Sequence, residues 1–147
     1  MAIMDAKLEL SDNQAITATA AAENVINFGD SDLEIGTGTP LYLNVVVGTA
    51  FDSAADDGTL TVALVNDSAV PIDGSSVVVY QTPAIAEATL VAGHKILRMP
   101  LPANVDEQQY VGLYYTVAGS GNFTAGKLDA WIDYGSQSSH DVQVAQS

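Results

Sequence analysis

Two groups of acidic side chains have a spacing that could bring carboxylate oxygens onto one metal ion. The first is Asp30, Asp32 and Glu34, and the second is Asp52, Asp56 and Asp57. Carboxylates are the ligands that Ca²⁺ prefers in proteins, but neither group has the glycine and distal glutamate of a helix–loop–helix calcium loop. We therefore interpret both groups as solvated carboxylates in turns, and a structural Ca²⁺ stays open at either place.

Other residue types that do chemistry are sparse or badly spaced. His94 and His140 lie far apart and the chain has no cysteine, so a zinc site is not expected. Gly36-Thr-Gly38 lacks the third glycine of a dinucleotide fingerprint, and Gly119-Ser-Gly121 lacks the spacing of a nucleophile elbow. No spacing singles out a pair of acids for glycoside hydrolysis. We expect a protein without catalytic residues or cofactors, and not an enzyme.

Composition narrows the class of partner. The chain of 147 residues carries 18 acidic residues against four Lys and Arg, giving a net charge of −14, while 48% of it is hydrophobic. Four scattered cations cannot neutralise phosphates along a nucleic acid or bind an anionic membrane, and no apolar stretch is long enough to span a bilayer. We expect neither nucleic acid nor membrane as a partner. Met1 to Leu10 shows no export signal, because Asp5 and Glu9 interrupt it.

The elements that must position these side chains are β-strands. In Leu41–Val47 the residues Leu41, Leu43, Val45 and Val47 alternate with Tyr42, Asn44 and Val46, and Thr59–Asn66 repeats the pattern with Leu60, Val62 and Leu64. The polar turn ending in Asp57-Gly58 between them predicts a hairpin. Val77–Tyr80 is apolar on both faces, which predicts a buried strand.

Further strands follow towards the C-terminus. Tyr110–Val117 alternates clearly, and Lys127–Tyr134 places Leu128, Ala130 and Ile132 inward. Ser11–Glu23 reads as extended or irregular, because its threonines disfavour a helix. About seven to eight antiparallel strands predict an all-β fold, a β-sandwich or jelly-roll-like domain. We expect one domain over residues 1–147, with an extended N-terminal segment of about 1–36 and a polar tail of about 135–147.

Two aromatic residues fall on strand faces that point outward. Alternation puts Trp131 and Tyr114 opposite the core-facing positions of their strands. One interpretation is that the sandwich curves over them. The other is a protein contact, since Trp and Tyr combine apolar area with a polar tip and are enriched at interface hot spots.

Several segments together resemble a known family. They are Met4-Asp-Ala6, Leu8–Thr17, Asn24–Gly29, Ile35–Tyr42, Phe51–Leu60 and Tyr110–Val117. The sequence of these segments is similar to that of capsid cement (decoration) proteins of short-tailed bacteriophages of the Bordetella-phage type. Val65–Ala92 and the tail after Gly135 are not covered by this resemblance.

The resemblance implies a jelly-roll-like protein on the outside of an icosahedral head that clamps neighbouring major capsid protein subunits. It also implies a homo-oligomer, usually a dimer, located in the virion and, during assembly, in the host cytoplasm. We expect contacts through strand edges, through the Asn24–Tyr42 segment with Phe28 and Tyr42, and through the faces bearing Tyr114 and Trp131. The alternative function is a calcium-dependent carbohydrate-binding β-sandwich, in which Trp131 and nearby tyrosines would stack on sugar rings.

Overall fold

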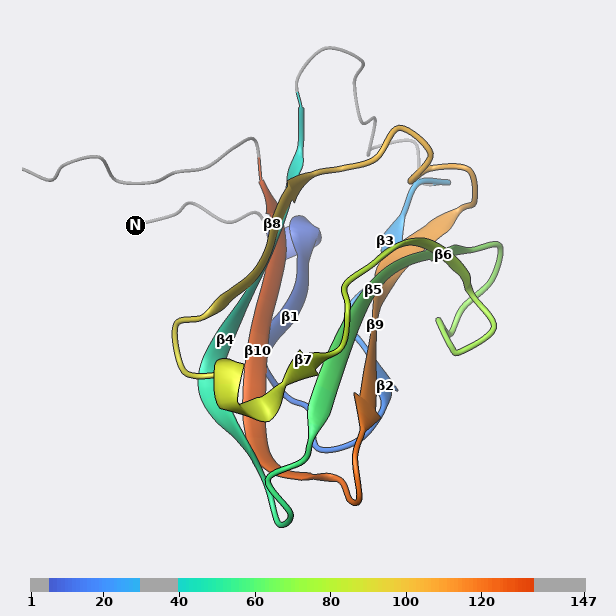
Figure 1. Cartoon of the computed structure of the whole chain (residues 1–147). Helices are drawn as coiled ribbons and strands as arrows, with labels where there is room; N and C mark the ends of the chain where they lie inside the picture. Colours follow the sequence, from blue (N-terminus) through green and yellow to red (C-terminus); the bar gives the residue numbers. More distant parts are fainter. Residues whose placement is uncertain (1–5, 30–39, 134–147) are drawn as a thin grey trace, which may run out of the picture.

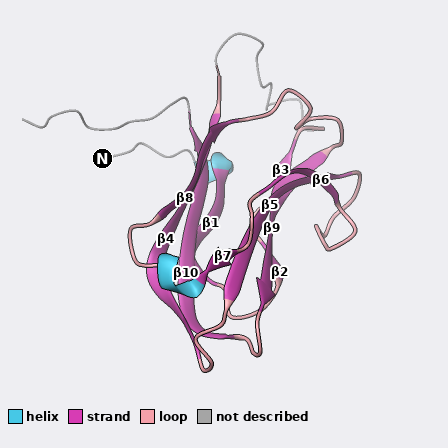
Figure 2. Ribbon diagram, viewed as in Figure 1, coloured by secondary structure: helices cyan, strands magenta, loops and turns pink. Residues whose placement is uncertain are grey.

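Two antiparallel sheets face each other in this protein. The computed structural model describes residues 6–29 and 40–133, and Figures 1 and 2 show the sheets as two layers. The described residues contain ten strands, three of them only two residues long, and two short 3₁₀ turns, η1 (Ala6–Leu8) and η2 (Glu87–Thr89). The predicted all-β sandwich is confirmed.

Each sheet draws its strands from distant parts of the chain. Sheet A has the order β1 (Glu9–Ala15), β10 (Phe123–Asp133), β4 (Tyr42–Ser53) and β8 (Lys95–Pro100). Sheet B has the order β2 (Ala20–Ala21), β9 (Tyr110–Ala118), β5 (Thr59–Asp67) and β6 (Val77–Gln81), with β3 (Ile26–Asn27) paired to β9 and β7 (Ile85–Ala86) paired to β5.

The alternation in the sequence determines which side chains fill the space between the sheets. From sheet A, Leu43, Val45 and Val47 of β4 are buried, as are Leu128, Ala130 and Ile132 of β10. Sheet B contributes Leu60, Val62 and Leu64 of β5 together with Val111, Leu113 and Tyr115 of β9. All of these belong to one apolar cluster, so removal of this surface from water is the main stabilising term of the fold.

A buried polar network ties the two sheets together near the start of the chain. The hydroxyl of Ser11 in β1 donates to Gln14 Oε1 at 2.6 Å and lies 2.8 Å from the Tyr115 hydroxyl in β9. Since the single hydroxyl proton of Ser11 is used on Gln14, Tyr115 must be the donor in the second bond. Burial raises the pKa of Tyr115, so it keeps its proton and can fill this role.

The N-terminal part of the chain is built into both layers. Of the segment predicted as extended or irregular, Ser11–Ala15 lies in β1 of sheet A and Ala20–Ala21 forms β2 of sheet B. No helix forms there, as the threonines indicate. The predicted C-terminal tail of about 135–147 lies outside the described residues.

The predicted hairpin between Leu41–Val47 and Thr59–Asn66 is wrong. These segments form β4 and β5, and β4 pairs with β10 and β8 while β5 pairs with β9, β6 and β7. The turn after Ser53 therefore carries the chain from sheet A to sheet B. The physical reason is that both strands have an apolar face, and these faces are buried by opposing each other across the core.

The prediction that Val77–Tyr80 is a buried strand is also wrong. This segment forms β6 at the end of sheet B, and Val77, Val78 and Tyr80 are 50%, 52% and 37% exposed. Only Val79 packs against the main core. An apolar run on both faces is typical of a strand with neighbours on every side, but among the described residues β6 has a single neighbouring strand, β5.

A proline limits β8. β8 ends at Pro100, and this strand lies at the other end of sheet A from β1. A proline lacks the N–H that a central strand would need, and an edge strand tolerates it. Among the described residues, no helix has the length or apolarity required to cross a membrane.

Candidate interaction surface

The outer face of sheet A carries two aromatic residues in adjacent rows, Trp131 and Tyr42 (the aromatic pair), together with charges of both signs. Strand pairing sets Trp131 opposite Asn44, and Asn44 opposite Arg98. In the next row Asp133 lies opposite Tyr42, and on the other side Asp129, Val46 and Lys95 form a third row. Directly opposed residues share a face, and the residues alternating with these are buried in the core, so these rows face outward.

Trp131 is held in place on this face. It is partly buried, and its indole Nε1–H donates to Asp133 Oδ2 at 3.1 Å. Its strand neighbours Ala130 and Ile132 are anchored in the core. A tryptophan with a fixed rotamer loses little conformational entropy when a partner covers it, which suits it to a contact anchor.

The four basic residues of the chain gather on one side of the molecule. Lys95 and Arg98 lie in β8, Lys127 lies in β10, and Lys7 lies in η1 immediately before β1. The strands of sheet B and the loops around them consequently carry acids alone. Strand pairing places β8 and β10 on either side of β4, so three of these cations, which are dispersed along the sequence, lie in one sheet.

The other predicted contact residues, Tyr114 and Phe28, lie elsewhere and are likewise partly buried. Tyr114 is partly buried on the outer face of sheet B, where it packs against a second apolar cluster of Ala63, Val65 and Ile72. Ile72 comes from the loop between β5 and β6, which therefore lies over this face. Phe28 follows β3 and packs against the main core. The structure thus brings Trp131 and Tyr42 together on sheet A and places Tyr114 and Phe28 apart from them.

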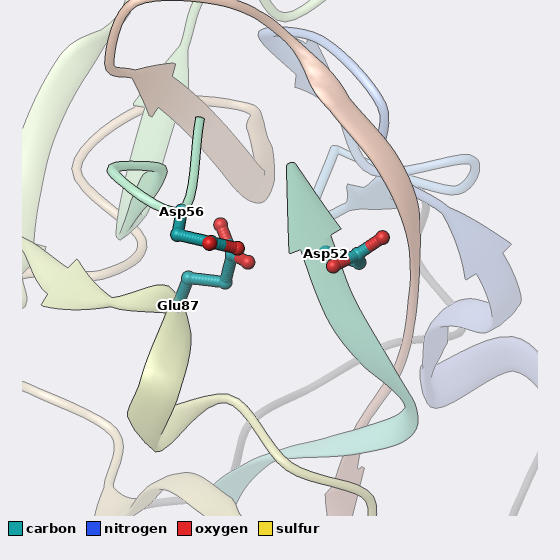
Figure 3. A group of neighbouring side chains, drawn as sticks. All are labelled: Asp52, Asp56 and Glu87. Atoms are coloured by element: carbon teal, nitrogen blue, oxygen red, sulfur yellow. The ribbon is translucent and has the colours of Figure 1, made fainter. Parts of the chain in front are cut away.

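One acidic cluster forms at the opposite end of β4 from Tyr42. Carboxylate oxygens of Asp52, Asp56 and Glu87 all lie within 4.8 Å of one another, and Figure 3 shows the three side chains drawn from β4, the following turn and η2. Such a set offers the oxygen ligands that a hard cation such as Ca²⁺ uses. Glu87 also accepts a hydrogen bond from Ser53. Asp52 and Asp56 are exposed, and exposed acidic groups are common without an ion.

The predicted acidic groups are rearranged by the fold. Asp52 and Asp56 do meet, but their third member is Glu87 and not Asp57. Asp57 instead accepts hydrogen bonds from the backbone N–H and the hydroxyl of Ser120, and these bonds lower its pKa from 3.8. Asp30, Asp32 and Glu34 lie outside the described residues. Glu87 had no signal in the sequence, since it is far from Asp52 along the chain.

The geometry counts against a sugar site that combines the aromatic pair with this cluster. Trp131 lies opposite Asn44, and Asp52 is eight residues further along the same strand. At roughly 3.3 Å per residue the two places are about 26 Å apart. A sugar ring stacked on Trp131 therefore could not reach an ion held by Asp52.

Comparison with known families decides the relationship of the chain. A family model described as Bbp16 matches residues 10–132. The chain belongs to the Bbp16 family. The family name indicates a protein of a Bordetella phage, and no curated protein matches the chain. The Bbp16 match begins in β1 and ends at the last but one residue of β10, so it covers both sheets.

Proposed function

We propose that this Bbp16-family protein is a non-enzymatic structural protein of a phage virion. In this proposal it binds the outside of an icosahedral capsid, acts as a homodimer, and cements neighbouring subunits of the major capsid protein. The observation that carries the proposal is the family match over residues 10–132, which covers nearly all of the described sandwich.

The outer face of sheet A suits such a contact. It presents Trp131 and Tyr42 among Lys95, Arg98, Asp129 and Asp133, so it offers apolar anchors and charges of both signs. All four basic residues of the chain lie in or beside sheet A, so this face alone can offer both signs of charge to complementary groups on a partner. We propose this face of sheet A as the capsid-binding face.

Cementing follows from mass action. A protein that binds the assembled shell but not free subunits stabilises the shell in proportion to its affinity and occupancy. A dimer that contacts two capsid subunits gains further, because the second contact forms at a high effective concentration. No catalytic group is needed for this function.

The experiment that tests the role compares phage heads made with and without this protein. We expect heads that lack it to lose their DNA at lower temperature, and addition of purified protein to restore the resistance. Equal heat resistance of both kinds of head would show that the cementing role is wrong.

A variant tests the capsid-binding face. Trp131→Ala should weaken binding to heads by about 2 kcal/mol or more, as truncation of a hot-spot tryptophan does. Val70→Ala, at a 51% exposed residue of the loop between β5 and β6 of sheet B, should bind as the native protein does. Thermal unfolding of both variants checks that the sandwich is intact, and co-sedimentation with heads measures the binding. Unchanged binding of a folded Trp131→Ala variant would exclude this face while leaving the cementing role to the test above.

A further inference from the structure

The strand β6 ends sheet B and has an open side. In the described part of the chain β6 pairs only with β5, through Ala63, Leu64, Val65 and Asn66. Alternate backbone N–H and C=O groups on the other side of an end strand have no ladder partner, and such a row is a template for pairing with another strand.

The side chains of β6 are unusually apolar for an exposed position. Val77, Val78 and Tyr80 are 50%, 52% and 37% exposed, and they are half of the six large hydrophobic residues exposed in the described chain. β-branched and aromatic residues are also those that pair best across strands. This edge therefore gains free energy when another strand covers it.

Charge is absent along this whole edge. No residue from Gly74 to Ala86 is charged, in a chain with a net charge of −14. The stretch includes both β6 and β7, which line the same side of β5. Two copies that repel each other elsewhere can approach here without bringing charged side chains of this edge together.

The other sheet ends are protected in ways that β6 is not. β8 carries Lys95, Arg98 and Pro100. β1 carries Glu9 and Asp12, and its pairing with β10 is interrupted by two register shifts. β2 and β3 are only two residues long. Charges, proline, bulges and short length all discourage edge-to-edge pairing, and β6 contains no proline or charged residue.

We propose that β6 is the self-association edge of this protein, where β6 of a second copy pairs antiparallel across a two-fold axis. An antiparallel strand pair on a two-fold axis is self-complementary, so a single neutral apolar strand supplies both halves of the interface. The result is one continuous sheet made from sheet B of both copies. This inference rests on the proposed function, in which the protein acts as a homodimer, and it names the surface that joins the two copies.

The first test places a charge on the edge. Val78→Glu should weaken the dimer about tenfold or more, because each copy would bring a carboxylate into a strand pair on the two-fold axis. Val91→Glu is the matched control, since Val91 is 55% exposed and the substitution adds the same charge in a loop that is bonded to β4 of sheet A and not to β6. Sedimentation velocity over a concentration series measures the dissociation constant of the native protein and both variants. Added salt should strengthen the native dimer, because it screens repulsion between two acidic copies.

A second test does not depend on the first variant folding well. The chain has no cysteine, so single substitutions Val77→Cys, Val78→Cys and Tyr80→Cys report on proximity without background. Under mild oxidation at least one of them should give a disulfide-linked dimer, whereas Val91→Cys should not. Residues near a two-fold axis lie close to their own counterparts, which makes this linkage specific for the proposed pairing.

Each outcome bears on the proposal. A native protein that stays monomeric at high concentration and high salt would overturn it, as would a dimer that survives Val78→Glu and forms no cysteine link in β6. If Val78→Glu abolishes binding to heads and the native protein is a monomer, the edge takes a strand of the capsid protein, and pairing of two copies is excluded. A Val78→Glu monomer that still binds heads would support the β6 pairing and leave the capsid-binding role intact.

Discussion

The Asp57 carboxylate joins two turns at one end of the sandwich. It lies in the turn from β4 to β5, and it accepts bonds from Ser120 in the turn from β9 to β10, with backbone N–H distances of 3.1 and 3.0 Å to its two oxygens. Both turns carry the chain from one sheet to the other. The Ser120 hydroxyl and the Ser120 N–H, which is shared between the two oxygens, both donate to the charged carboxylate, and this lowers the pKa of Asp57 from 3.8.

A pH titration tests this link. Because the pKa is lower in the folded state, the stabilisation is present above 3.8, the ordinary value, and is lost as the pH falls through the lowered pKa. The Ser120 amide resonance, followed by NMR, should therefore shift with a midpoint below 3.8. Asp57→Asn should abolish this step and Asp56→Asn should leave it. A step that persists in Asp57→Asn would contradict the assignment.

At the scale of the element, β10 depends on one glycine that no side chain could replace. Gly126 has φ +139, a conformation that is strained for other residues, and a Cβ there would lie 2.3 Å from Phe51 Cδ1. The β10–β4 pairing shifts register on both sides of Ala125, so a bulge turns the strand at this point. Phe51 itself packs edge-on against Phe123, with ring centroids 4.8 Å apart.

Substitution at this glycine should be costly. We expect Gly126→Ala to lower the free energy of unfolding by about 3 kcal/mol, from backbone strain together with overpacking against Phe51. Gly121→Ala is the control, because a Cβ at Gly121 meets no heavy atom within 4 Å; it should change stability by about 0.5 kcal/mol or less. Urea unfolding measures both. Equal stabilities would refute the role of the bulge.

At the scale of the whole molecule, the basic residues are unevenly distributed between the two sheets. All four basic residues lie in or beside sheet A, while the net charge of the chain is −14. A compact state with so many like charges repels itself, and salt screens that repulsion. The same polarity leaves the outer face of sheet A as the part of the surface with charges of both signs.

Moderate salt should therefore raise the melting temperature of the native protein. Glu107→Lys, at an exposed residue of the loop before β9, should raise the melting temperature in low salt and reduce the further gain from added salt. Differential scanning calorimetry at two salt concentrations checks this. A lower melting temperature of Glu107→Lys in low salt would show that overall repulsion does not limit stability.

Alternation and composition alone determined the β class, the inward residues of β4, β5, β9 and β10, and the acidic character of the protein. Alternation is readable because it is local: successive side chains of a strand point to opposite faces whatever the strand pairs with. The inward set Leu43, Val45 and Val47 was therefore predictable, and the structure buries all three.

Pairing was decided only by the tertiary structure, because it depends on contacts between residues far apart in the sequence. β4 and β5 look like a hairpin, yet burial of both apolar faces places them in opposite sheets. For the same reason Glu87 joins Asp52 and Asp56, Lys127 shares a face with Lys95 and Arg98, and β6 becomes an open edge where a buried strand was expected. Each of these depends on which strand lies alongside, and one strand's own residues do not specify its neighbour.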